Sequence, residues 1–164
     1  MRKMITAIAL AGLAAAPAAA DTNLASPAGQ WTLDQSDSGC TVYREFAAGK
    51  ERYFVHLNRY AGDPAMELVV LHEDKPDNEI FRVNGDLVID DGELSYNPEI
   101  HRISVYGGFV RFGTPLDPAS HRLASVDTSL TMKAGRLIDV RFATGPMAKA
   151  VEALESCAAG DMKA

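Results

Sequence analysis

The sequence predicts an α+β domain that is mostly β: an antiparallel curved sheet or sandwich, with a short helix near 118–124 and a C-terminal helix packed on it. Three observations lead to this prediction. Short runs alternate apolar and polar side chains, which is typical of half-buried strands. Clusters of Gly, Pro, Asn and Asp separate these runs. Only the last apolar run repeats at three- and four-residue spacing, which indicates a helix.

The first half of the chain contains the clearest strand patterns. Alternation along 40–46 places Cys40, Val42 and Phe46 on one face. The apolar run Leu68 to Leu71 has no alternation, which predicts burial on both faces. The predicted strands cover residues 30–34, 40–46, 52–60 and 65–71, and the two central ones form a hairpin.

The second half is predicted from its turns. Asn84-Gly85 separates the runs 80–83 and 86–89, and an Asn-Gly pair in that position is the strongest short-range signal of a hairpin. Asp117-Pro118 supplies a cap and a first residue for the short helix, which would end near Ala124. Further strands are expected over residues 100–106, 109–112, 129–133 and 137–142, and the last two form a hairpin around Ala134-Gly135.

The last element is an amphipathic helix. Pro146 suits the first helical position after a cap at Thr144 or Gly145. One apolar face follows, and Lys149, Glu152 and Glu155 are expected to face water. The apolar face consists of Met147, Ala150, Val151, Leu154 and Cys157 or Ala158.

The N-terminus has the pattern of a cleavable, Sec-type export signal. Arg2 and Lys3 precede an apolar stretch, Met4 to Ala16, that is too short to span a bilayer, and Ala18-Ala19-Ala20 fits the cleavage rule. We therefore expect a signal peptide over 1–20, a loose lead-in over 21–28, one β-rich domain over 29–159 and a frayed tail over 160–164. The alanine-rich signal indicates a periplasmic location without a membrane span after processing.

The charge of the processed chain excludes one class of partner. Removal of residues 1–20 leaves 14 basic and 22 acidic side chains, a net charge of −8. A protein that grips nucleic-acid phosphates needs a basic surface, so no nucleic acid is expected as a partner. The sequence does not determine the oligomeric state.

Cys40 and Cys157 are the only cysteines, and in an exported chain they permit one disulfide. An oxidising compartment allows that bond to persist. Two separate buried thiols are the alternative. A redox motif or a zinc site would need closely spaced partners that neither cysteine has.

The two ends of the chain carry a resemblance. Trp31 and Leu33 read as a tryptophan strand before Cys40, and Leu137 to Phe142 precede a Gly turn, a helix and Cys157. This arrangement resembles small Gram-negative periplasmic modules of the invasion-associated locus B type, and is similar to the extracytoplasmic module that precedes TonB C-terminal domains. The resemblance implies a β-rich module closed by a disulfide, with a non-catalytic role in the envelope.

A search for catalytic or metal-binding motifs finds none, and no cofactor is expected. His56 alternates with apolar neighbours and should face solvent, and His72-Glu73-Asp74 reads as a polar turn rather than an acid–base cluster. His101 and His121 have no partner at metal-ligand spacing. The acidic stretch Asp86, Asp90, Asp91 and Glu93 fails the spacing of a calcium loop and reads as a solvated loop.

Four aromatic residues of the first hairpin, Tyr43, Tyr53, Phe54 and Tyr60, form a possible binding face, although packing could also explain them. Three function hypotheses remain. The first is a non-enzymatic module that binds an envelope protein through a strand edge or this aromatic hairpin. The second is a binder of a small ligand or peptide in a sheet cavity. The third is a hydrolase whose residues are scattered, which would need His72 or His121 beside a carboxylate and a hydroxyl.

Overall fold

The computed structural model of the chain describes residues 24–63, 65–73, 81–90, 94–105, 109–116 and 118–160. The expected signal peptide and the tail after Gly160 lie outside these residues, as do Asp91, Glu93 and Asp117. The elements are β1 (Leu24–Pro27), β2 (Thr32–Ser36), β3 (Gly39–Ala48), β4 (Glu51–Tyr60), β5 (Met66–Glu73), β6 (Phe81–Asn84), β7 (Asp86–Ile89), β8 (Leu94–Tyr96), β9 (Glu99–Val105), β10 (Phe109–Leu116), the 3₁₀ helix η2 (Pro118–Ser125), β11 (Leu130–Ala134), β12 (Ile138–Phe142) and α1 (Ala148–Ala158).

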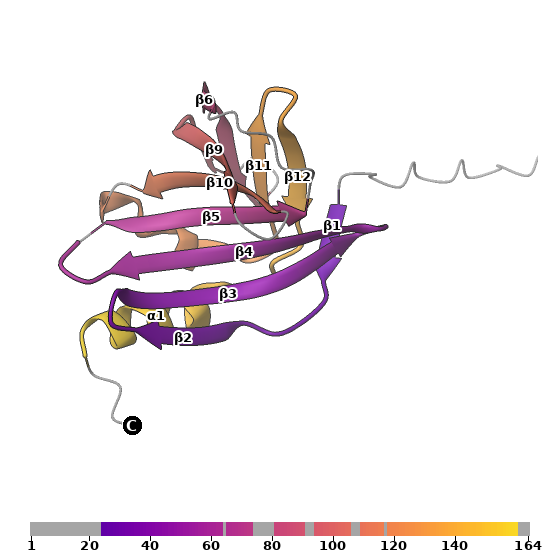
Figure 1. Cartoon of the computed structure of the whole chain (residues 1–164). Coiled ribbons are helices and arrows are strands. Elements are labelled where there is room, and N and C mark those ends of the chain that lie inside the picture. The colour runs from indigo at the N-terminus through magenta and orange to yellow at the C-terminus, as the bar shows by residue number, and fades with distance from the viewer. Residues whose placement is uncertain are drawn as a thin grey trace, which may run out of the picture.

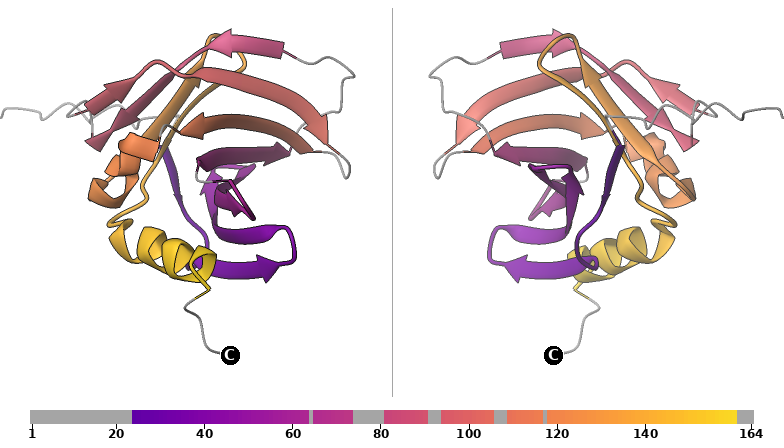
Figure 2. Two further views of the ribbon diagram at one scale, coloured as in Figure 1. Left: turned by 90° about the vertical axis from the view of Figure 1, so that its left-hand side faces the viewer. Right: turned by 90° about the vertical axis from the view of Figure 1, so that its right-hand side faces the viewer.

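The strands form one sheet that curls into a half-barrel (Figure 1). Their order is β6-β9-β10-β5-β4-β3-β1-β12-β11-β7-β8, and β2 pairs with β3 beside this path. The predicted mostly-β fold with a C-terminal helix packed on the sheet is confirmed, and Figure 2 shows α1 across the open side of the curl. The sheet is mixed rather than purely antiparallel, because β1 runs parallel to β12.

The segment expected to be a loose lead-in contains β1, so that expectation is wrong for residues 24–27. Leu24 is in register with Arg141 of β12, and Ser26 is in register with Ala47 of β3. β1 therefore joins the two halves of the sheet. Its four residues show no alternation that would predict a strand. Pairing with the neighbouring strands holds them extended.

The predicted Asn84-Gly85 hairpin is also wrong. β6 pairs with β9, whereas β7 pairs with β11 and β8, so the two strands do not pair with each other. The chain instead passes from one half of the sheet to the other at Gly85, whose N–H donates to the carbonyl of Pro98 at 3.0 Å. A Cβ at Gly85 would lie 2.3 Å from Cδ1 of Ile100 and 2.5 Å from the carbonyl oxygen of Lys133. This glycine is needed for close packing rather than for a turn.

The concave face of the sheet, the inner face, holds the core. Phe142 of β12 contacts Phe46 of β3 and Tyr53 of β4, with ring centroids 5.3 and 5.7 Å apart. These rings pack the two halves of the sheet against each other across β1. Each fully buried side chain of this size contributes about 1.5–3 kcal/mol relative to exposure. Besides Phe46 and Phe142, the largest fully buried side chains of the described residues are Phe112, Leu57, Leu68, Leu87, Ile100, Leu130, Met132, Met147, Leu154 and Val42.

Asp90, expected to lie in a solvated acidic loop, fixes the end of β7 to the start of β11. Its carboxylate accepts hydrogen bonds from the backbone N–H groups of Asp127, Thr128 and Ser129 and from the Thr128 hydroxyl, at 2.7–3.2 Å. Burial opposes ionisation, but these four donors outweigh it and lower the pKa of Asp90 to about 2. The residue adopts a φ of 45°, which Asp tolerates better than most residues.

α1 carries the predicted apolar face, since Ala150, Val151, Leu154 and Cys157 are buried and Ala158 is exposed. The helix begins later than predicted, because Met147 rather than Thr144 or Gly145 occupies the N-cap. Thr144 is buried, and Gly145 has a φ of 62°, so this segment turns before the helix starts. The side chain of Glu155, expected in water, lies 3.6 Å from the guanidinium of Arg59.

The predicted disulfide is confirmed. Cys40 of β3 and Cys157 of α1 are bonded, with Cα atoms 6.1 Å apart and a sequence separation of 117. Both residues are buried. The bond fastens the C-terminal end of α1 to the inner face of the sheet.

The double substitution Cys40→Ala with Cys157→Ala should lower the free energy of unfolding by about 4–5 kcal/mol. The bond closes a loop above 100 residues, which removes much conformational entropy from the unfolded chain. Urea unfolding of the oxidised chain and of this variant measures the difference. Reduction of the natural chain should reproduce the loss, while a reductant should leave the variant unchanged. Equal stability of both chains would contradict this role of the bond.

The substitution Gly85→Ala should lower the free energy of unfolding by about 1–3 kcal/mol, because the new methyl group overpacks the corner between β6 and β7. Gly29→Ala is the matched control, since a Cβ there meets no atom within 4 Å. The control should change stability by less than about 0.5 kcal/mol in the same urea unfolding experiment. An unchanged Gly85→Ala variant would show that the corner can relax.

Candidate functional site

The four aromatic residues of the possible binding face do not share one face. Tyr43, Phe54 and Tyr60 point to the outer, convex face of the sheet, and Tyr60 is 45 % exposed. Tyr53 points inward and is 7 % exposed, stacked on His72 with ring centroids 4.6 Å apart. Alternation along β4 separates residues 53 and 54 onto opposite faces, so only three of the four could act on one surface.

A polar network centred on Glu67 occupies the outer face. The Glu67 carboxylate accepts hydrogen bonds from the Tyr60 hydroxyl at 2.8 Å, from Asn58 Nδ2 at 3.3 Å and from the Arg111 guanidinium. The Thr41 hydroxyl donates to Asn58 Oδ1 at 2.9 Å. Burial alone would raise the pKa of Glu67, but the donors and the Arg111 charge outweigh it and lower this pKa. These groups bond to one another, so the network reads as structural.

His56 lies on the outer face as expected, but it is largely covered rather than facing solvent. Its ring stacks on Tyr43, with centroids 5.3 Å apart at 27°. Burial and, second, the positive charge of Arg111 lower the pKa of His56 to about 4. The imidazole is therefore neutral at pH 7 and adds no charge to this face.

An apolar groove of about 340 Å³ lies between β2 and α1, at the margin of the sheet. This volume is near the lower end of small-ligand sites, which span about 300–1,000 Å³. Small residues on α1, Ala150 and Ala153, leave the space open, and Lys149 is the one charged side chain on its wall. The wall consists of Trp31, Leu33, Val42, Pro146, Lys149, Ala150 and Ala153.

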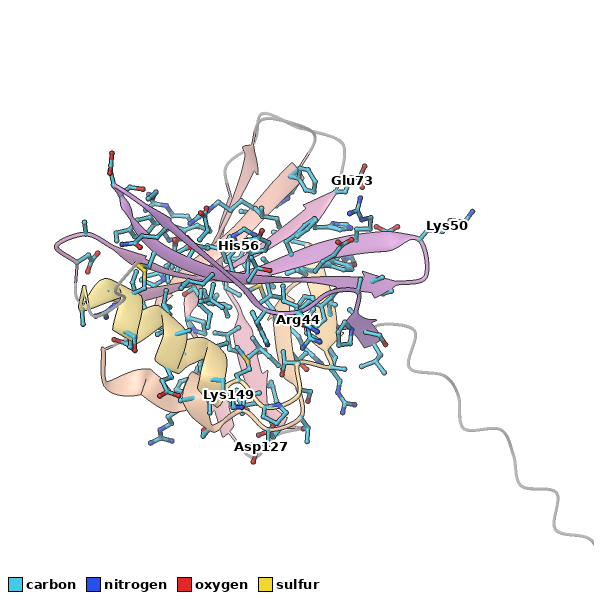
Figure 3. The ribbon with its side chains drawn as sticks, turned by 90° about the horizontal axis from the view of Figure 1, so that it is seen from below. Arg44, Lys50, His56, Glu73, Asp127 and Lys149 are labelled. Carbon is cyan, nitrogen blue, oxygen red and sulfur yellow. A yellow bond between two sulfur atoms is a disulfide. The ribbon has the colours of Figure 1, made fainter. Side chains whose placement is uncertain are left out.

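Arg44 of β3 bonds to the segments that lead into both walls of this groove, away from the disulfide. Its Nε donates to the carbonyl of Gly29, just before Trp31, at 2.7 Å. Its Nη1 donates to the carbonyl of Thr144, just before α1, at 3.0 Å. The guanidinium also lies 6.0 Å from the ring centroid of Trp31. Figure 3 shows Arg44 below the sheet, between the labelled Lys149 on α1 and Lys50 at the hairpin tip.

The edge of β2 beside the groove is free of any other strand in the part of the chain that the structure describes. β1 and β2 share one edge of β3, and in the described part of the chain β2 pairs with no other strand. Register with β3 places Leu33 and Gln35 toward the inner face and Thr32, Asp34 and Ser36 toward the outer face. An edge strand presents unpaired N–H and C=O groups that can pair with another chain.

A second hollow, of about 380 Å³, opens over the disulfide at the opposite end of β2. Its rim includes the exposed Asp37 and Asp63 and the ring of Tyr60, and Cys40 and Cys157 line its floor. This hollow is polar and open. Gln35 and Ser36 of β2 also line it, but it lacks the apolar wall of the groove, so we assign it no role in binding.

The histidines do not assemble a hydrolase site among the described side chains. His72 Nε2 lies 2.7 Å from the Glu51 carboxylate, and His101 Nε2 lies 2.7 Å from Glu99, but neither has a hydroxyl partner in the described contacts. The side chain of His121 lies outside the described residues. Within the same limits, no three His, Cys, Asp or Glu side chains gather as a metal site.

Comparison with protein-family models, with curated proteins and with solved structures gives no match for this chain. The expected resemblance to periplasmic modules therefore stays a prediction.

Sequence reasoning identified Trp31, Leu33 and the helix face, but not the groove that they form with one another. No local pattern could identify it, because its two walls are more than a hundred residues apart in the chain. The one available signal was the pair of small residues, Ala150 and Ala153, on a helix whose other inward residues are larger.

The substitution Arg111→Gln should raise the pKa of His56 above about 4, while burial keeps it below the ordinary value of 6.5. A pH titration of the His56 ring by NMR measures this shift. Arg52→Gln is the control, because Arg52 pairs with Glu45 on the same face and should leave the titration unchanged. Since folding lowers this pKa, the His56 contribution to stability is lost as the pH falls from 6.5 to 4. A His56 midpoint near 6.5 in the natural chain would contradict the burial of the ring.

Proposed function

We propose that this chain is an exported, non-enzymatic module that binds an envelope protein in the periplasm. The observation that carries the proposal is the free edge of β2 beside an apolar groove. Backbone hydrogen bonds along such an edge provide affinity, and an adjoining pocket for alternate side chains provides selectivity. The first sequence-based hypothesis named a strand edge as one of two possible surfaces, and the geometry favours the edge over the aromatic hairpin.

The location rests on two supports. The Cys40–Cys157 bond is of the kind that persists in oxidising compartments such as the periplasm. The N-terminal sequence has the pattern of an export signal over 1–20. No helix in the described part of the chain is long and apolar enough to cross a membrane.

A second candidate function is the binding of a small ligand or short peptide. The volume of the groove favours it, since about 340 Å³ is enough for a small molecule. The interior of the curled sheet is filled by Phe46, Phe112, Phe142 and their neighbours. A small ligand would therefore occupy the same groove and compete with a protein partner.

Site-specific photocrosslinking tests the proposal. A benzophenone side chain replaces Lys149 at the wall of the groove or Lys50 at the exposed tip of the β3–β4 hairpin. Figure 3 shows these two lysines on widely separated parts of the molecule. We expect one dominant envelope protein to crosslink from position 149 and not from position 50, because only the first lies beside the free edge.

A matched pair of substitutions on α1 controls this experiment. Ala153→Phe fills the groove and should abolish the crosslink, while Ala148→Phe adds the same ring to the exposed side of the helix and should preserve it. A crosslink that persists in the Ala153→Phe variant, or that forms equally from position 50, would refute the groove as the binding site. If no envelope protein crosslinks above background while a small molecule occupies the groove, the second candidate is favoured.

A further inference from the structure

The partner of the β2 edge can be specified further from the two faces of this strand; this inference rests on the proposed function. We infer that the edge binds an extended segment in which Lys or Arg alternates with aliphatic residues, added to the sheet as a strand beside β2. Three features of the described residues carry the inference: the alternation of β2, the apolar groove on one side and the uncompensated acidic charge on the other.

The alternation of β2 fixes where the side chains of an added strand must lie. Leu33 is in register with the buried Val42, so it faces inward, whereas Asp34 is in register with Thr41 and faces outward. A strand hydrogen-bonded to this edge continues the same pleat. Every second side chain of the partner therefore falls into the groove beside Leu33, and the others lie over the outer face beside Asp34.

The groove selects aliphatic side chains at the inward positions. Its wall is formed by Trp31, Leu33, Val42, Pro146 and the two alanines of α1, with no acidic group among them. Lys149 on the same wall disfavours a basic residue there, since two like charges in contact repel. The inward positions of the partner are thus apolar and not cationic, and this fixes the register of the added strand.

The outward positions select basic side chains. Asp34 on β2 and Asp37 in the adjoining turn are both exposed, and neither has an ion pair among the described residues. β2 itself carries no cation. The processed chain has a net charge of −8, so the long-range field also attracts a basic segment.

The same charge argues against a second copy of this chain as the occupant. Two β2 strands that pair antiparallel about their central residue place Asp34 directly opposite Asp34. Like charges directly opposite each other in a sheet destabilise the pair. A segment that places Lys or Arg opposite Asp34 avoids this repulsion and gains a cross-strand ion pair.

Three capped hexapeptides test the inference with the mature chain. The first alternates lysine and valine, the second alternates glutamate and valine, and the third has the first composition as three lysines followed by three valines. Trp31 is the only tryptophan and lines the groove, so its fluorescence reports occupancy without a label. We expect the alternating lysine peptide to bind, and the other two to bind at least about fivefold more weakly, in line with one or two cross-strand pairs.

Two variants, with a third as control, separate charge from strand addition. Asp34→Lys should weaken the alternating lysine peptide about fivefold and strengthen the glutamate peptide. Ser36 and Gly39 flank the two-residue hairpin between β2 and β3 and form a hydrogen-bonded pair. Hydrogen-bonded and non-hydrogen-bonded pairs alternate along the strand, so we expect the N–H of Gln35 to point to the free edge. Gln35→Pro removes that donor and should abolish binding, whereas Gln35→Ala retains it and should not. Asp34→Lys lies on the surface and keeps the test valid if the proline variant does not fold.

Each further outcome decides between the inference and its alternatives. Equal binding of the alternating and block lysine peptides, or binding that survives Gln35→Pro in a folded chain, would overturn strand addition. Dimerisation of the mature chain that Gln35→Pro abolishes would make a second copy the occupant and overturn the inference. If no peptide binds while the benzophenone at position 149 still crosslinks one envelope protein, the inference fails and the proposed function stands. If both experiments fail, the proposed function fails as well.

Discussion

The attachment of α1 to the inner face of β3 is the constraint on which the rest of this structure depends. The Cys40–Cys157 bond holds the C-terminal end of the helix, and Arg44 holds the segment before its N-terminal end through the carbonyl of Thr144. Between these two points, Met147, Val151 and Leu154 close the open side of the curled sheet. The groove exists because the helix is fixed at both ends while two of its residues toward β2, Ala150 and Ala153, are small.

The curl of the sheet is produced by two features that act at a distance from the helix. β1 joins β3 to β12, and Gly85 lets the chain cross from β6 to β7 where a side chain would not fit. Both bring the two halves of the sheet face to face, so that Phe46 and Phe142 can pack in one core. Because β1 takes only one end of the β3 edge, β2 is left at the margin with a free edge of its own.

Much of the ionisable chemistry of the described residues serves the fold. Asp90 connects two strands through backbone donors, Glu67 accepts from Arg111, Tyr60 and Asn58, and His56 is half-buried and neutral against Tyr43. Groups engaged in this way have little capacity left for proton transfer or metal binding. The β2 edge pairs with no other strand in the described part of the chain and borders an apolar groove, and the proposed binding function rests on this contrast.

The sequence by itself determined the mostly-β class, the β3–β4 hairpin, the apolar face of α1 and the disulfide, because alternation, helical spacing and a single cysteine pair are local or unique signals. It could not determine β1, whose four residues are held extended only by β3 and β12, nor the corner at Gly85, where an Asn-Gly pair imitates a hairpin. Tyr53 and Phe54 are adjacent in sequence, yet the pleat sends one into the core and the other outward. The groove was decided by tertiary structure alone, since its walls meet only after α1 returns to β3, and no pattern within one segment records which distant segment it will face.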